Sequence, residues 1–115
     1  MPSKKQLDSE LLHASCVVIG ACGVLLLGKS GSGKSDLALR LIKGGATLVS
    51  DDQVKLSRNG RSIVAAAPDN IKGLLEIRGL GILRFPQKDG VNIKEFFCVL
   101  KEKKFIFYQT KCRMK

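Results

Sequence analysis

Short apolar runs, separated by glycine-rich turns, fill the first part of the chain. Residues 11–19 are apolar and β-branched, residues 20–23 supply a turn, and residues 24–27 form a second apolar run. This pattern predicts a β-hairpin. Further on, residues 35–43 repeat apolar side chains at helical spacing and are followed by two glycines. We therefore expect one amphipathic helix there.

The pattern after the helix predicts further strands. Residues 47–50 form a short apolar strand, and residues 53–56 and 62–66 flank an Asn-Gly turn that favours a second hairpin. Residues 68–75 are expected to open with a helical turn, and the glycines that follow, through residue 81, predict a loop. Strands that alternate with one helix predict a compact α/β domain with a mixed β-sheet.

Composition agrees with a small globular protein. The chain has 115 residues, of which 44% are hydrophobic and 26% charged. Its longest apolar stretch, residues 21–27, is far shorter than the roughly 20 residues that cross a bilayer, so we expect no membrane span. The N-terminus lacks the apolar segment of a secretory signal, which makes the cytoplasm the expected location.

The cysteines show no metal-binding or disulfide pattern. There is no CxxC pair, and His13 is the single histidine. In a cytoplasmic protein such cysteines are expected to be reduced thiols that fill the core. This prediction concerns Cys16, Cys22, Cys98 and Cys112.

The end of the chain differs in composition from the rest. All six aromatic residues lie after Arg84, whereas every glycine but one precedes it. We therefore divide the chain into residues 1–84 and a divergent basic and aromatic end, residues 85–115. Within that end, residues 96–100 and 105–108 predict an aromatic hairpin around a basic turn.

The chain is strongly basic. Twenty Lys and Arg residues against ten Asp and Glu residues give a formal net charge of +10. Such a charge attracts phosphates, acidic proteins and anionic surfaces without naming one of them. Aromatics interleaved with lysines also occur where proteins bind single-stranded nucleic acid. Two strands around a solvated turn are the simpler interpretation, so we do not expect a nucleic-acid partner.

The strongest chemical signal is a complete GxxxxGK[ST] motif between an apolar strand and the amphipathic helix. Its glycines allow backbone N–H groups to surround a phosphate, and the helix N-terminus adds a favourable dipole. The lysine can reach the β- and γ-phosphates, and the final hydroxyl can bind the Mg²⁺ that bridges them. The motif predicts that a nucleoside triphosphate binds at Gly28, Lys29, Ser30, Gly31, Ser32, Gly33, Lys34 and Ser35.

Two adjacent carboxylates follow the strand after the helix. Asp51 and Asp52 are placed as acidic residues are when a strand delivers them beside a phosphate loop. On an extended backbone, their side chains would point to opposite faces. One carboxylate could then orient Mg²⁺ or its waters while the other abstracts a proton from an acceptor hydroxyl.

Together these motifs resemble a known family. In order along the chain they are a His-bearing strand, GVLLLGKSGSGKS, LVSDD, an AAP turn and LLEIRGLGI. The chain resembles the catalytic domain of HPr kinase/phosphorylase, the bacterial enzyme that phosphorylates a serine of the phosphocarrier protein HPr. The resemblance covers roughly residues 11–84, and the chain looks like the short proteobacterial form because no separate sensing residues precede the match.

The resemblance assigns roles to individual residues. It implies that the phosphate loop binds ATP, that Ser35 and Glu76 hold Mg²⁺, and that Asp52 is the acid/base for both phosphorylation and the reverse reaction. The remaining active-site positions that it implies are His13, Lys34, Asp51 and Arg78. Arg78 is a suitable donor for a phosphate or for the HPr backbone. The resemblance also implies a homo-oligomer, commonly a hexamer, that regulates carbohydrate metabolism.

Other functions remain open from the residues themselves. Beyond Arg84, the basic active-site residue and the C-terminal helical segment of the family are not recognisable, which favours an ATP-binding module with impaired catalysis as the first alternative. A phosphate loop does not identify its acceptor, so a small-molecule kinase is a second alternative. Nucleic-acid binding through the positive charge is a third.

Overall fold

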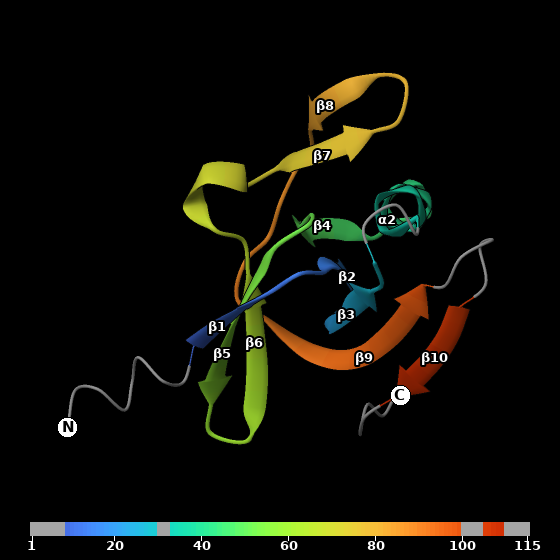
Figure 1. Ribbon diagram of the computed structural model, residues 1–115. Coiled ribbons are helices and arrows are strands. Elements are labelled where there is room, and N and C mark those ends of the chain that lie inside the picture. Colours follow the sequence, from blue (N-terminus) through green and yellow to red (C-terminus); the bar gives the residue numbers. More distant parts are fainter. Residues whose placement is uncertain (1–8, 30–32, 100–104, 110–115) are drawn as a thin grey trace.

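The structure, a computed structural model, describes residues 9–29, 33–99 and 105–109 (Figure 1). One helix and two sheets make up this part of the chain, together with a short 3₁₀ turn. The elements are β1 (Ser9–Leu12), β2 (Ser15–Ile19), β3 (Cys22–Leu27), α2 (Lys34–Lys43), β4 (Thr47–Ser50), β5 (Val54–Asn59), β6 (Ser62–Ala66), the turn η1 (Asp69–Ile71), β7 (Leu74–Ile77), β8 (Gly81–Arg84), β9 (Val91–Val99) and β10 (Phe105–Gln109).

Eight of the strands form one mixed sheet. Its order is β1-β5-β6-β9-β3-β2-β4, and β10 pairs with β9 off this path. The pairing of β3 with β9 is parallel, whereas the other pairings of this sheet are antiparallel. Strands β7 and β8 form a separate two-stranded sheet. This architecture confirms the predicted α/β fold with a mixed sheet.

The first predicted hairpin and helix are confirmed. Strands β2 and β3 pair antiparallel around Gly20 and Ala21, and α2 ends at Lys43, where the N–H of Gly44 donates to the last turn of the helix. The predicted strand over residues 11–19 is instead divided at His13. The part before His13 leaves the sheet centre and pairs with β5 as β1.

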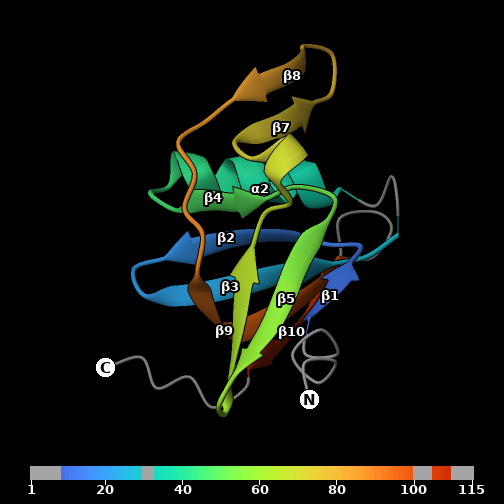
Figure 2. The same ribbon diagram turned by 90° about the vertical axis from the view of Figure 1, so that its left-hand side faces the viewer.

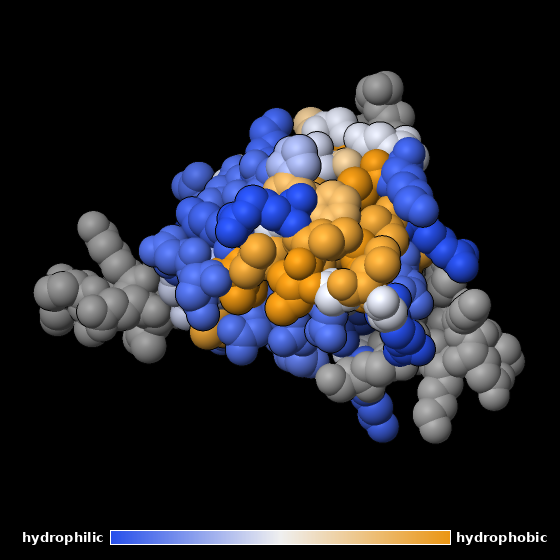
Figure 3. Space-filling view, turned by 90° about the horizontal axis from the view of Figure 1, so that it is seen from above, coloured by the Kyte–Doolittle hydropathy of each residue, from blue (hydrophilic) through white to orange (hydrophobic). Residues whose placement is uncertain are grey.

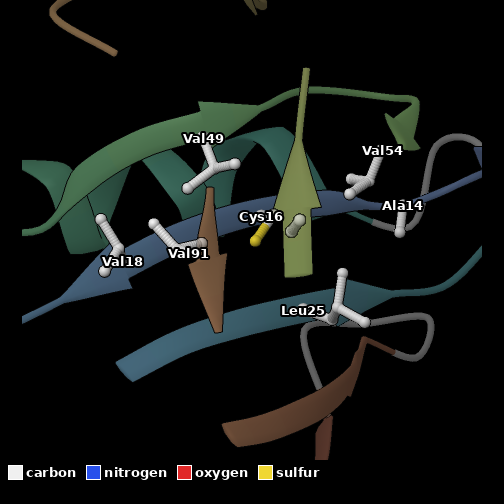
Figure 4. Close-up of a cluster of buried hydrophobic side chains, with 8 residues drawn as sticks. Ala14, Cys16, Val18, Leu25, Val49, Val54 and Val91 are labelled. Carbon is white, nitrogen blue, oxygen red and sulfur yellow. The ribbon is translucent and has the colours of Figure 1, made fainter. Parts of the chain in front are cut away.

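Alternating side chains of β2 and β3 build a core on each face of the sheet. Cys16, Val18 and Leu25 pack with Val49, Val54 and Val91 on one face (Figure 4). Val17, Val24 and Leu26 point to the other face, where α2 covers them (Figure 2). Successive residues of a strand point to opposite faces, and both faces of β2 and β3 are buried. Apolar residues therefore follow one another along these strands instead of alternating with polar ones.

Later elements differ in part from the prediction. The second hairpin is confirmed as β5 and β6, with its turn at Gly60 and Arg61, and η1 supplies the predicted helical turn. The predicted loop through residue 81 is wrong: residues 74–77 and 81–84 pair as the β7–β8 hairpin. Gly79 lies in the hairpin turn and Gly81 is the first residue of β8, and they adopt positive φ angles of 87° and 103°.

Strand β9 connects the two halves of the main sheet. It pairs with β6 through Val91 and Asn92, with β3 along most of its length, and with β10 at its far end. It bends strongly between these partners (Figure 1). The β9–β10 pairing confirms the predicted aromatic hairpin, whose basic turn lies outside the described residues. The division into residues 1–84 and 85–115 stays a prediction, although β9 is a central strand of the sheet.

Of the two cysteines whose side chains the structure describes, Cys16 lies in the core as predicted, whereas Cys22 is only half-buried. Cys16 and Cys22 are not in disulfides. Cys16 is fully buried, and burial raises the pKa of its thiol to about 12. The side chains of Cys98 and Cys112 lie outside the described part of the chain. Within that part, no helix is long and apolar enough to cross a membrane.

Candidate active site

The phosphate-loop motif lies between β3 and α2, as its sequence predicts. Gly33 precedes the helix with φ 107°, a left-handed conformation that favours glycine. The Lys34 side chain is buried, and its Nζ donates to the carbonyl oxygens of Gly28 at 2.8 Å and Lys29 at 3.3 Å. An ammonium group has three N–H donors, so one remains for a phosphate. Ser30, Gly31 and Ser32 lie outside the described residues.

The Asp51 carboxylate joins three elements at the end of β4. Its Oδ1 accepts hydrogen bonds of 2.8 Å from the hydroxyls of Ser15 in β2 and Ser35 in α2. Its Oδ2 accepts a longer bond, 3.4 Å, from the backbone N–H of Glu76 in β7. Asp51 as a whole is only 8% exposed. Asp51 therefore fixes the phosphate-loop serine, the central sheet and the β7–β8 hairpin around one point.

Asp52 lies in a tight turn rather than on an extended strand. Its φ is 75°, and the N–H of Gln53 donates to the carbonyl oxygen of Asp51 at 2.9 Å. These are features of a γ-turn of the rare, strained kind. The expectation of an extended backbone at this position is therefore wrong. The side chains of the two aspartates still have different partners. The turn at Asp52, and not the alternation of side chains along a strand, directs them apart.

The turn brings Asp52 to the single histidine. Asp52 Oδ1 lies 3.6 Å from Nδ1 of His13, and the two side chains are 66% and 51% exposed. His13 lies at the break between β1 and β2, where it can reach the turn after β4. The Asp52 carboxylate thus faces solvent, whereas its neighbour Asp51 is buried.

A cavity of about 340 Å³ contains most of the predicted site. The loop and helix line one side of it, and β2, the turn after β4 and the β7–β8 hairpin line the other. From the hairpin come Glu76 and Arg78, both exposed. The lining residues are Ser15, Gly33, Lys34, Ser35, Asp36, Asp51, Asp52, Glu76 and Arg78. Seven of these were predicted as site residues, whereas Ser15 and Asp36 were not. The structure therefore gathers the seven predicted residues in one place, with His13 beside Asp52.

Comparison with known proteins agrees with this geometry. The family model described as HPr Serine kinase C-terminal domain matches residues 4–98. The chain belongs to this family. The expected resemblance to HPr kinase/phosphorylase is thereby confirmed. The match extends past Arg84 and includes most of β9.

Curated relatives carry the same family name. The chain is 48% identical over 91 residues to the HPr kinase/phosphorylase of Peptoclostridium acidaminophilum, which covers 78% of this chain and 30% of that protein. It is 38% identical over 94 residues to the HPr kinase/phosphorylase of Malacoplasma penetrans, which covers 81% of this chain and 31% of that protein. The chain thus spans less than a third of the length of either relative.

A solved structure shows the same fold. The HPr(Ser) kinase/phosphatase from Coxiella burnetii matches with a TM-score of 0.75 and 29% sequence identity. The match covers 83% of this chain and 68% of that one. The mixed sheet with helix α2 is therefore the fold of an HPr kinase family member.

The residues present fit a magnesium nucleotide. Among the described residues, no three His, Cys, Asp or Glu side chains gather closely enough to hold a metal ion by themselves. Mg²⁺ does not need such a cage, because it usually takes one or two carboxylates, substrate phosphates and waters. The Ser35 hydroxyl and the Asp51 carboxylate are in contact, and Glu76 lines the same cavity. This donor set is all oxygen, as Mg²⁺ prefers.

One participant was missed by sequence reasoning. Ser15 is fully buried in β2, yet its hydroxyl contacts Asp51 and the backbone of Asp52. In the sequence it stands in an apolar run, 36 positions before Asp51. A polar residue inside an otherwise apolar strand was the available signal, since buried hydroxyls need a partner.

Proposed function

We propose that this chain is the nucleotide-binding and phosphotransfer core of an HPr serine kinase/phosphorylase, which uses ATP and Mg²⁺ to phosphorylate a serine of HPr. The observation that carries this proposal is the 2.8 Å bond between the hydroxyl of Ser35 and the carboxylate of Asp51. It joins the phosphate loop to the acidic turn that also presents Asp52 to the cavity. Family membership supports the same function.

The loop and helix would bind the triphosphate. Backbone N–H groups of the loop and the N-terminus of α2 favour negative charge. Lys34 would release the loop carbonyls and donate to the β- and γ-phosphate oxygens. When bound, Mg²⁺ neutralises charge on these phosphates; Ser35 and Glu76 would hold it, with Asp51 as a further ligand or as the residue that orients its waters.

Asp52 would move the proton. In the kinase direction the serine hydroxyl of HPr attacks the γ-phosphorus, the bond to the β-phosphate oxygen breaks, and Asp52 takes the hydroxyl proton. In the reverse direction inorganic phosphate attacks the phosphoserine phosphorus, pyrophosphate forms, and Asp52 returns the proton to the departing serine oxygen. His13, 3.6 Å from Asp52, would orient this carboxylate.

The hairpin would meet the acceptor. Arg78 is exposed, lines the cavity beside Glu76 and has five N–H donors for a phosphate or for backbone carbonyls of HPr. The chain would act as part of a cytoplasmic homo-oligomer, a hexamer in the family's manner, and would regulate carbohydrate metabolism through the phosphorylation state of HPr.

The test is phosphorylation of purified HPr. We expect ATP and Mg²⁺ to yield HPr that carries one phosphate on a serine, detected by intact and fragment mass spectrometry. Lys34→Ala should lower the rate at least ~10²-fold, because a donor to the transferring phosphoryl group is lost. Lys43→Ala, at the exposed end of the same helix, is the matched control and should keep the rate. ATP binding without phosphoserine would instead support the catalytically impaired module.

A further inference from the structure

Ser15 has a hydroxyl where its strand is otherwise apolar. It lies in β2 with no exposed surface, next to the core residues Cys16 and Val17. Its Oγ donates to Asp51 Oδ1 at 2.8 Å and accepts from the backbone N–H of Asp52 at 3.3 Å. A serine hydroxyl has one donor and two acceptor lone pairs. Ser15 therefore uses its donor on one aspartate and an acceptor position on the next.

The bond to Asp51 determines which way that carboxylate faces. Oδ1 is shared by Ser15 and Ser35, so the two hydroxyls approach the same oxygen from β2 and from α2. Oδ2 faces the backbone N–H of Glu76. If the Ser15 bond were absent, the carboxylate would keep one partner from the helix and one long contact to the hairpin. Its orientation would then depend only on the contacts from Ser35 in α2 and from the Glu76 N–H in β7.

The bond to Asp52 restrains a strained turn. Asp52 has φ 75°, which an L-residue seldom adopts without support from its surroundings. The start of β2 supplies that support on both sides, because the N–H of Ala14 donates to the Asp52 carbonyl at 3.1 Å while Ser15 accepts from the Asp52 N–H. The conformation that aims Asp52 at His13 is thus held by a strand 37 positions away.

We propose that Ser15 is a positioning residue for both carboxylates: one buried hydroxyl orients Asp51 toward Ser35 and holds the Asp52 amide in the turn that faces His13. The consequence for phosphotransfer rests on the proposed function, whereas the positioning itself does not. Ser15 has no exposed surface, and it acts through the two aspartates.

The positioning is tested first without nucleotide. Hydrogen exchange at single backbone amides, measured by NMR, reports whether the Asp52 N–H is bonded. In Ser15→Ala the backbone amide hydrogen of Asp52 should exchange at least about fivefold faster than in the wild type, because this amide loses its hydrogen-bond acceptor. Cys16→Ala is the matched control: it removes one buried atom from the next residue, which packs in the cluster on the other face. Equal exchange in the two variants would overturn the proposal.

The second readout is the effect of Mg²⁺ on ATP affinity. Mg²⁺ should raise the affinity for ATP by the same factor in the wild-type chain and in Cys16→Ala. In Ser15→Ala this factor should be at least about fivefold smaller. The affinity for ATP without Mg²⁺ should change less than twofold, which distinguishes carboxylate positioning from general loosening. An unchanged Mg²⁺ effect in Ser15→Ala would overturn the proposal. If Ser15→Ala has these effects but the wild-type chain does not phosphorylate HPr, the proposed function is contradicted while the positioning role of Ser15 stays supported.

Discussion

Two regions of the molecule meet at the site, and they are built differently. The central strands β2, β3 and β4 carry their residues on a sheet with a buried core on each face. The β7–β8 hairpin is separate from that sheet and buries mainly Leu75. Its apolar residues Leu80, Ile82 and Leu83 are between 41% and 71% exposed. Figure 3 shows apolar surface on the face of the molecule that carries the hairpin.

The two regions contribute different residues to the site. The sheet and its helix carry the phosphate-loop motif together with Asp51 and Asp52, for which we propose the metal and acid/base roles. The hairpin supplies Glu76 and Arg78 from an element held by fewer contacts, which is suitable for residues that meet an incoming partner. Changes to the proposed chemistry should therefore be largest on the sheet side. Changes of stability should be large at buried contacts of either region and least at the exposed hairpin face.

The largest expected effect is chemical and lies on the sheet side. Asp52→Asn removes the proposed base while keeping the size of the side chain. We expect HPr phosphorylation to fall by roughly 10²–10⁴-fold, the usual contribution of a positioned general base. ATP affinity should stay within about twofold. Asp69→Asn, a change at an exposed carboxylate in η1, is the control. Initial rates of phosphoserine formation measure the effect, and a loss smaller than tenfold would remove Asp52 from this role.

The attachment of the hairpin is the next test. Leu75 is fully buried among residues of α2 and the sheet. Leu75→Ala should lower the free energy of unfolding by about 2–5 kcal/mol through lost burial and the cavity left behind. Leu80→Ala, at a residue 71% exposed in the hairpin turn, should change it by about 0.5 kcal/mol or less. Urea denaturation measures both, and equal losses would contradict the contrast between the buried attachment of the hairpin and its exposed face.

Close packing inside the main sheet gives a third prediction. A Cβ added at Gly23 would lie 2.6 Å from the backbone oxygen of Asn92, because β3 and β9 approach closely there. A backbone atom of a central strand cannot move aside easily, so Gly23→Ala should cost roughly 1–3 kcal/mol of stability. Gly44→Ala is a matched control, since its nearest contact would be 3.5 Å. Thermal denaturation of the two variants decides, and equal melting temperatures would contradict the prediction.

An ion pair near the hairpin gives the smallest of the four predicted effects. Lys72 lies 2.7 Å from Asp89 at the base of the hairpin, and this partner raises the pKa of Lys72. Burial favours a higher pKa for Asp89, but hydrogen bonds from Lys72, the Ala67 amide and Gln87, with the charge of Lys72, outweigh it and lower the pKa. Asp89→Asn should therefore cost on the order of 1 kcal/mol near pH 7.

The sign of the pH dependence follows from the lowered pKa of Asp89. Its stabilising contribution is present above the ordinary value of 3.8 and is lost as pH falls through the folded-state pKa. The stability difference between wild type and Asp89→Asn should shrink in that acid range. Denaturation curves at several pH values measure it. A difference that grows on acidification would contradict the assignment.

Local signals in the sequence predicted much of the fold and the site. The β2–β3 hairpin, α2, β4 and the phosphate loop follow from apolar runs and glycine punctuation. Long-range pairing could not be predicted in this way: β1 leaves β2 to pair with β5, and β9 enters between β6 and β3. The left-handed turn at Asp52 was also not predicted, because the residue in this conformation is not a glycine. It is held instead by Ala14 and Ser15, which are distant in sequence.

The central claim is that the two regions converge on one magnesium nucleotide. The most direct test is ATP affinity with and without Mg²⁺ for wild type, Asp51→Asn, Glu76→Gln and the double variant, with Glu10→Gln in exposed β1 as control. Each single change should reduce the gain that Mg²⁺ provides. The double variant should lose less than the sum of the two losses in binding free energy, because residues at one site are coupled. A Mg²⁺ gain that survives both single changes would contradict the claim.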